Sequence, residues 1–128
     1  MSWYDSAVFY HIYPLGLCGC AHENDGRAVP GAFRKLDAWA AHAWQLGCNA
    51  IYIGPLFESG SHGYDTVDSR RVDRRLGSNE EFAAWVRSCH ARGQKVIVDG
   101  VFNHVGRGFF AFQGLKQHRG GLAYPDRF

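Results

Sequence analysis

The stretch VIVDGVFNHV, residues 96–105, decides how this chain folds and where its chemistry lies. Three β-branched apolar residues lead directly into Asp99, and Asn103 and His104 follow four and five positions later. A short β-branched run of this kind is typical of a buried strand. A strand that ends in a carboxylate, an amide and an imidazole has two explanations: a reactive site at its end, or an ordinary polar loop.

Strands and helices alternate along the chain up to this stretch. Short aromatic and β-branched runs predict strands, and apolar residues at intervals of three and four predict helices, the second of which Ser78 and Glu81 open as a capping box. This alternation is typical of an α/β fold with parallel strands joined by helical crossovers. The predicted strands lie near 8–13, 49–53 and 95–100, and the predicted helices near 32–46 and 79–92.

Two other segments are predicted to be long loops. Residues 54–77 are rich in glycine, serine and aspartate, and the segment after Asn103 shows no strong helix or strand pattern. Loops of that length are often functional or disordered.

The composition fits one globular domain, because 46% of its 128 residues are apolar and 20% are charged. The net charge of +2 is too small to predict a nucleic acid or a membrane surface as a partner. One basic cluster exists, Arg70-Arg71 with Arg74-Arg75, and two nearby aspartates dilute it. We predict that this cluster is a solvated face.

The sequence also favours a cytoplasmic protein. It has no run of about 18 apolar residues, and its N-terminus lacks the basic region and cleavage site of a signal peptide. Its four cysteines lack zinc-ligand spacing and fit free thiols in a reducing compartment.

Polar side chains gather after all three predicted strands. In parallel α/β sheets ligands bind at the carboxyl ends of the strands, and the loops at the opposite ends are short here. This asymmetry predicts one functional face. Its residues are Cys18, Cys20, His22, Glu23, Asn24 and Asp25 after the first strand, Glu58, Ser59, Ser61, His62, Tyr64, Asp65 and Asp68 after the second, and Asp99, Asn103, His104 and Arg107 after the third.

By residue type alone, the chemistry of this face stays open. Asp65 and Asp99 could form a general acid/base pair assisted by His104. Asp99, Asn103 and His104 could instead bind a metal, because oxygen ligands suit calcium and imidazole suits transition metals. A structural explanation is also possible, because such residues often cap helices, pair with arginine or bond to backbone. A small flavodoxin-like domain is a further alternative, although no glycine-rich phosphate loop follows a strand.

Four stretches resemble glycoside hydrolase family 13, the α-amylase family, in the matching order. DGVFNHV (99–105) is similar to that family's first signature region, and SHGYDTVD (61–68) to the loop after its second barrel strand. VFYHIYPLG (8–16) and NAIYIGPLFES (49–59) resemble its first two strands. The members that the chain most resembles are cyclomaltodextrinases and neopullulanases.

The resemblance implies a (β/α)8 TIM barrel that acts on α-linked glucans with retention of configuration. Residues 1–128 would be the N-terminal portion of that catalytic barrel, its first three βα units, incomplete in this chain. The implied partners are an α-linked glucan or maltooligosaccharide and the remaining barrel segments of the same full-length chain.

The resemblance also assigns roles by position. Tyr64 is similar to the tyrosine that stacks on the sugar in the cleaved subsite, and His104 to the histidine that hydrogen-bonds that sugar. Asp99 is similar to a carboxylate that orders the site rather than attacks, which argues against the acid/base pair. His62 and Asp65, in the loop of Tyr64, are implied to bind substrate.

Calcium is the cofactor that the resemblance implies. Asn103 is similar to a residue that ligates structural calcium in many α-amylases. Cyclomaltodextrinase-like members often lack this ion, so calcium is a prediction at one residue.

The resemblance implies that this chain alone is catalytically inert. Retaining hydrolysis needs a nucleophile and a general acid roughly 5–5.5 Å apart. The family supplies them after its fourth and fifth strands, whereas here no glutamate follows Glu81 and Asp126 is the only aspartate after Asp99. The alternative function is a truncated, non-catalytic carbohydrate-binding remnant.

Incomplete closure predicts poor stability as well. A barrel of this type needs about 250 residues to close. We therefore expect the chain alone to be marginally stable and aggregation-prone, with its apolar side chains only partly covered. The side chains expected to be exposed in this way are Trp39, Trp44, Trp85 and the phenylalanines of 109–112.

Overall fold

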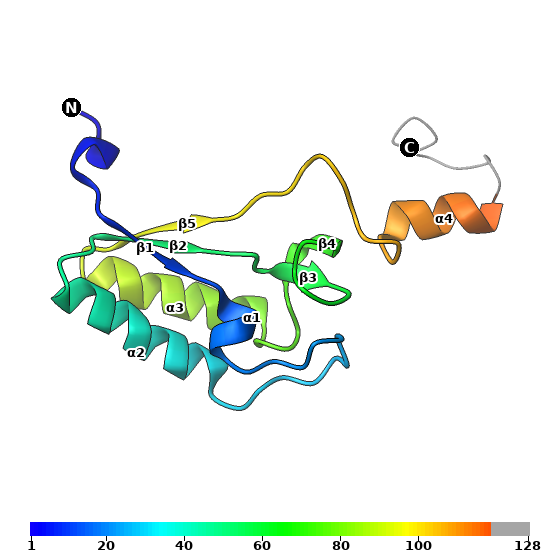
Figure 1. The fold of residues 1–128 in the computed structure, drawn as a ribbon, viewed down its shortest axis with the longest axis horizontal. Coiled ribbons are helices and arrows are strands. Elements are labelled where there is room, and N and C mark those ends of the chain that lie inside the picture. Colours follow the sequence, from blue (N-terminus) through cyan, green and yellow to red (C-terminus); the bar gives the residue numbers. More distant parts are fainter. Residues whose placement is uncertain (119–128) are drawn as a thin grey trace.

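Three parallel strands form the central sheet of the computed structural model, which describes residues 1–118 (Figure 1). β2 lies in the middle, and its Ile53 is opposite Ile12 on one side and Val98 on the other. The predicted α/β fold with parallel strands is confirmed, and each strand lies within its predicted range. The strands are β1 (Phe9–Ile12), β2 (Ala50–Ile53) and β5 (Lys95–Val98), in the order β1-β2-β5.

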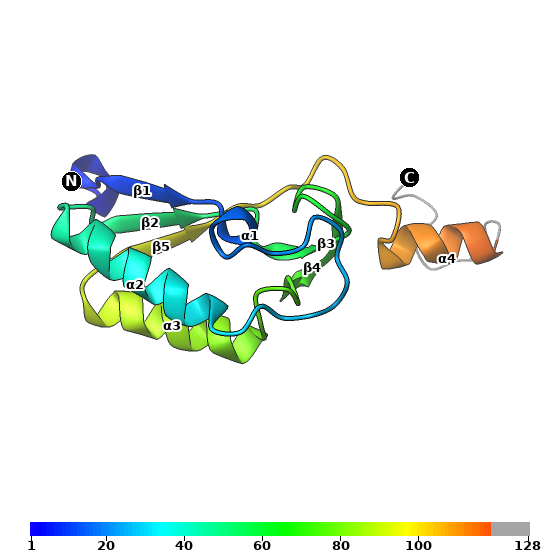
Figure 2. The same cartoon turned by 60° about the horizontal axis from the view of Figure 1, so that its bottom comes forward.

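Two helices cover one face of this sheet, as Figures 1 and 2 show. They are α2 (Ala32–Gln45) and α3 (Asn79–Ala91). The predicted capping box opens α3: the Ser78 hydroxyl accepts from the Glu81 amide at 3.1 Å, and the Glu81 carboxylate accepts from the Ser78 amide at 2.8 Å. Gly47 follows α2 with φ of 92°, a left-handed conformation that ends helices and favours glycine.

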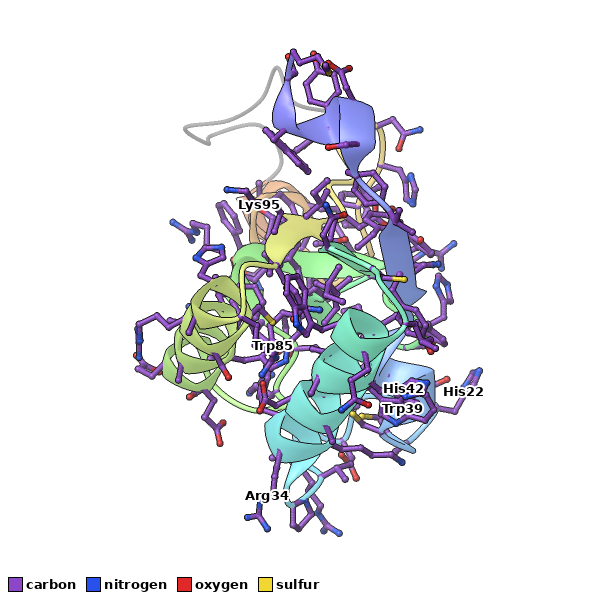
Figure 3. The ribbon with its side chains drawn as sticks, turned by 90° about the vertical axis from the view of Figure 1, so that its left-hand side faces the viewer. His22, Arg34, Trp39, His42, Trp85 and Lys95 are labelled. Atoms are coloured by element: carbon purple, nitrogen blue, oxygen red, sulfur yellow. The ribbon has the colours of Figure 1, made fainter. Side chains whose placement is uncertain are left out.

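The core lies between these helices and the sheet. Leu36 of α2 packs with Ile51 and Ile53 of β2, and all three are 0% exposed. Burial of such a side chain contributes about 1.5–3 kcal/mol. Figure 3 shows Trp85 between α3 and α2, and Trp39 on the flank of α2 that faces away from α3.

The predicted exposure of the tryptophans is partly wrong. Trp85 is only 3% exposed, because the paired helices and the three strands already cover it. Trp39 and Trp44 are 36% and 43% exposed, as predicted, and Phe110 is 47% exposed.

The predicted long loop over residues 54–77 is wrong, because it contains an antiparallel hairpin. Its strands are β3 (Phe57–Ser59) and β4 (Thr66–Val72). Of the four buried strand positions in the hairpin, only Val72 is apolar, whereas Glu58, Ser59 and Thr66 are polar and 4%, 1% and 6% exposed. The alternation of apolar and polar residues that reveals a strand is therefore missing from the sequence.

Three short helices complete the described residues. They are η1 (Trp3–Ser6), α1 (Pro14–Leu17) and α4 (Phe110–His118). The last contradicts the predicted loop after Asn103, and both cartoons show it beyond the hairpin, away from the sheet. The Arg70 guanidinium lies 5.5 Å from the ring centre of Phe110 and joins α4 to β4. A contact of this kind between distant residues cannot be recognised from the local sequence, so the pattern analysis missed α4.

The predicted solvated basic face is wrong for one of its four arginines. Arg70, Arg71 and Arg74 are exposed, but the side chain of Arg75 is 1% exposed and lies 2.9 Å from Asp73. Among residues 1–118, no helix is long and apolar enough to cross a bilayer.

Candidate active-site face

Four residues predicted for the functional face meet beyond the carboxyl ends of β2 and β5: Tyr64, Asp99, Asn103 and His104. In Figure 1 the hairpin and the connection after β5 both lie at the end to which the strand arrows point. The Tyr64 turn, residues 61–65, joins β3 to β4, and Asp99 directly follows β5. The fold thus brings two distant stretches of the chain together.

Tyr64 and Asp99 form the centre of this face. The Tyr64 hydroxyl donates a 2.8 Å hydrogen bond to Asp99 Oδ2. This bond, helped by partial burial, raises the pKa of Tyr64 to about 12, so the phenol is neutral at physiological pH. The residue is 40% exposed, so the aromatic side chain is held by its tip while part of it stays accessible.

His104 is oriented by contacts on both ring nitrogens. Nε2 lies 2.9 Å from the carbonyl oxygen of Tyr64, and Nδ1 lies 2.8 Å from Asn103 Oδ1. The backbone of Tyr64 therefore holds the imidazole, while the Tyr64 side chain is held by Asp99. Tyr64, Asp99 and His104 thus form one connected group, to which Asn103 is joined through His104.

His62 and Asp65 hold the Tyr64 turn in shape. His62 Nδ1 accepts from the Tyr64 amide at 3.2 Å, and the Tyr13 hydroxyl donates to the His62 carbonyl at 3.1 Å. Asp65 Oδ2 accepts from the Ser61 hydroxyl at 2.8 Å. Burial alone would raise the pKa of Asp65, but hydrogen bonds from the hydroxyl and amide of Ser61 and from its own amide, together with the nearby His62, hold that pKa below its ordinary value.

The two carboxylates considered for an acid/base pair have different partners. Asp65 Oδ2 bonds to Ser61, whereas Asp99 Oδ2 bonds to Tyr64. In these bonds the two carboxylates therefore share no partner.

The loop after α1 packs against the hairpin. The Asn24 amide donates at 2.7 Å to both Glu58 Oε1 and the Ser59 carbonyl. The buried Cys18 thiol faces the carbonyl of Ala32. Several polar residues of the predicted face therefore fix this loop in place.

Tyr52 and Gly54 are site residues that the sequence patterns did not indicate. Burial, followed by a hydrogen bond to Asp99, raises the pKa of the Tyr52 phenol. The Tyr52 ring stacks on His11 with centroids 4.7 Å apart. A Cβ on Gly54 would overlap the Cβ of Asp99, so only glycine lets β2 approach Asp99 this closely. The pairing of β1 with β2 places His11 opposite Tyr52. Knowledge of that strand register would therefore have pointed to Tyr52.

The residues around Asn103 do not by themselves form a calcium site. Calcium takes six to eight oxygen ligands, and the single Asn103 side-chain oxygen already lies against His104. No group of three histidine, cysteine, aspartate or glutamate side chains within residues 1–118 is placed to hold a metal.

A cleft of about 350 Å³ opens beside Asp99. It is bordered by the start of the hairpin and by the connection after β5. Among the residues that line it are Pro55, Gly63, Thr66, Val98, Asp99 and Phe102.

A parallel βα sheet with an aromatic residue, a carboxylate and an imidazole at its carboxyl ends is typical of the active face of a TIM-barrel enzyme. The chain belongs to the α-amylase family, glycoside hydrolase family 13, because the model of the alpha amylase catalytic domain matches residues 29–126. The resemblance noted in the sequence is confirmed.

Curated relatives extend over nearly the whole chain. A cyclomaltodextrinase of Thermoanaerobacter pseudethanolicus is 38% identical over 119 residues, which cover 92% of this chain and 20% of the relative. Neopullulanase 2 of Thermoactinomyces vulgaris is 33% identical and is covered to 24% of its length, against 98% of this chain. The chain thus spans about a fifth to a quarter of these relatives.

Solved structures agree with the family. The cyclic α-maltosyl-(1→6)-maltose hydrolase of Arthrobacter globiformis, in complex with that sugar, superposes with a TM-score of 0.79 at 30% identity. The match covers 95% of this chain and 31% of that structure, as expected for part of a barrel.

Proposed function

We propose that this chain forms the first three βα units of a retaining α-glucan hydrolase or transferase, and that its face binds the sugar in the cleaved subsite. The observation that carries the proposal is the connected group of Tyr64, Asp99 and His104 at the strand ends. An aromatic face suits the apolar side of a sugar ring, and an imidazole beside it suits a hydroxyl.

Within this proposal Asp99 orders the site and does not attack. Its Oδ2 accepts the Tyr64 phenol, and Tyr52 approaches the same carboxylate. His62 and Asp65 support substrate binding by holding the turn that carries Tyr64. The nucleophile and the general acid come from barrel segments beyond this part of the chain, so residues 1–128 alone are inert.

The names of the relatives support an α-linked glucan as the substrate class. Related proteins are a cyclomaltodextrinase and a neopullulanase, and a related structure contains maltose. The test is to express the complete reading frame and to measure hydrolysis of maltooligosaccharides and cyclomaltodextrins. Release of the α-anomer of the sugar is expected. Failure to cleave any α-glucan, or release of the β-anomer, would refute the proposal.

The second candidate function is a carbohydrate-binding remnant without catalysis. It is favoured by one observation: Tyr64 and His104 are oriented by residues of this chain, Asp99 and Asn103 among them. Titration of residues 1–128 with maltotriose, followed by NMR shifts of His104, tests it. Two results together would favour the remnant over the enzyme. Residues 1–128 would bind maltotriose at millimolar concentration, and the product of the complete reading frame would cleave no α-glucan.

Calcium binding at Asn103 and a cytoplasmic location both stay predictions. Calcium would need further oxygen ligands besides Asn103, and it would stabilise this connection without taking part in the reaction. A melting temperature of the complete protein that is unchanged by chelator would argue against calcium. The cytoplasmic location is supported by the free cysteines, and cell fractionation tests it.

A further inference from the structure

Arg75 is a buried cation behind the candidate face. Its side chain is 1% exposed, and its Nε and Nη2 donate to the two carboxylate oxygens of Asp73, each at 2.9 Å. A two-pronged pair of this kind fixes the plane of the guanidinium as well as its position.

The same guanidinium holds two other segments of the chain. Nη1 donates to the carbonyls of Ala21 at 2.7 Å and His22 at 3.3 Å, in the loop after α1. Nη2 donates to the Ser59 hydroxyl at 3.1 Å and to the Ser61 carbonyl at 2.6 Å, at the end of the hairpin strand β3. Two segments that are distant from Arg75 in sequence are thus tied to this one side chain.

One of these bonds leads directly to the candidate site. Ser61 begins the Tyr64 turn, and its hydroxyl donates to Asp65 Oδ2 at 2.8 Å. The Gly60 amide donates to the Asp65 carbonyl at 3.2 Å and closes the turn. Arg75 therefore holds the base of the Tyr64 turn, while Asp99 holds the tip of the Tyr64 side chain.

We propose that Arg75 is a positioning residue that sets where the Tyr64 ring stands against the bound sugar. The inference rests on the proposed function, because it concerns how Tyr64 meets its substrate. Lysine cannot replace Arg75 in this role, since an ammonium has no planar fork and cannot reach Asp73, Ser61 and Ala21 together. Loss of the fork would let the turn shift and would misalign the ring.

The test is a double-mutant cycle in the protein encoded by the complete reading frame. The variants are Arg75→Lys, Tyr64→Ala and their combination, with Arg71→Lys as the matched control, because Arg71 is an exposed arginine of β4. Values of kcat and KM on maltooligosaccharides are measured per folded molecule, with the folded fraction taken from near-UV circular dichroism.

Arg75→Lys is expected to lower kcat/KM about tenfold with Tyr64 present and about twofold or less in the Tyr64→Ala background. Most of the loss should fall on kcat, and Arg71→Lys should stay within about twofold of the parent. A purely structural Arg75 would reduce the folded fraction and leave kcat per folded molecule unchanged, and that result would overturn the inference.

Equal losses in the two backgrounds would also overturn it, even if Tyr64→Ala is itself impaired as expected. A Tyr64→Ala protein with full activity would instead contradict the proposed function. If Arg75→Lys does not fold, Ser59→Ala replaces it in the cycle, because it removes one acceptor of Nη2 and keeps the pair with Asp73. Additive effects of Ser59→Ala and Tyr64→Ala on kcat/KM would likewise overturn the proposed positioning role of Arg75.

Discussion

The phenol of Tyr64 donates a 2.8 Å hydrogen bond to Asp99 across 35 positions of sequence. The bond links the hairpin turn to the end of β5. It also leaves Tyr64 40% exposed, so part of the aromatic side chain stays accessible. Under the proposed function, the ring and the hydroxyl have separate tasks: the ring contacts the sugar and the hydroxyl attaches to Asp99.

Replacing Tyr64 should separate these two tasks. In the complete protein Tyr64→Ala is expected to lose about 2–4 kcal/mol of transition-state stabilisation, because both ring and bond are removed. Tyr64→Phe keeps the ring and should lose about 0.5–1.5 kcal/mol. Steady-state kinetics on maltooligosaccharides measure both, with Tyr4→Phe at an exposed N-terminal position as the control. An unchanged rate for Tyr64→Ala would refute the stacking role.

Titration of the tyrosines should reveal the bond to Asp99 directly. Because the folded pKa of Tyr64, about 12, lies above its ordinary value near 10, the bond stabilises the protein fully below about pH 10. This contribution is lost as the pH rises through about 12. Tyrosinate absorbance should show a late transition that Tyr64→Phe removes and Asp99→Ala moves to lower pH. A late transition that survives Tyr64→Phe would contradict this assignment.

Gly54→Ala should displace Asp99. The added Cβ would overlap the Cβ of Asp99, and overpacking of this kind costs about 1–3 kcal/mol. Activity should fall more than stability explains, since the acceptor for Tyr64 moves. Gly31→Ala is the control, because its φ of 73° strains an alanine while its Cβ meets open space. Thermal unfolding measures the loss of stability, and kcat measures the loss of activity. A Gly54→Ala protein that loses stability but keeps its kcat would contradict the role given to Gly54.

Two cysteines should resist alkylation in the folded protein. Burial raises the pKa of both Cys20 and Cys89 to about 11. At pH 8 only about one molecule in a thousand then carries the reactive thiolate at either position. Iodoacetamide labelling with peptide mass mapping should show slow reaction at both, and rapid reaction once the protein is unfolded. If folded Cys20 were labelled as fast as free cysteine, its thiol would not be protected by burial, and the raised pKa would be refuted.

Residues 1–128 expressed alone should be marginally stable and prone to association. Phe102 is 94% exposed beside the cleft, and Val98 is 40% exposed at the edge of the described sheet. Exposed apolar groups next to an open strand edge promote association. Size-exclusion chromatography should show oligomers that Phe102→Ser reduces without lowering the melting temperature. A monomer with a cooperative transition would contradict this expectation.

The hairpin and Arg75 show why sequence patterns missed part of the site. Glu58 of β3 is buried because the Arg74 amide and guanidinium and the Asn24 amide all bond to its carboxylate. Patterns that expect apolar residues at buried positions therefore predict a loop there. Arg75 reaches Ala21, 54 positions away, and no local signal distinguishes it from its exposed neighbour Arg74.

The sequence by itself determined the order of parallel strands and helices, the side of the sheet that carries the polar residues, and the family. These features depend on short-range patterns: the capping box at Ser78, the glycine after α2, and the DGVFNHV motif. Only the tertiary structure decided that Tyr64 bonds to Asp99, that Gly54 must be small and that Arg75 is buried. Each depends on partners brought together by strand register and loop packing, which no window of neighbouring residues contains.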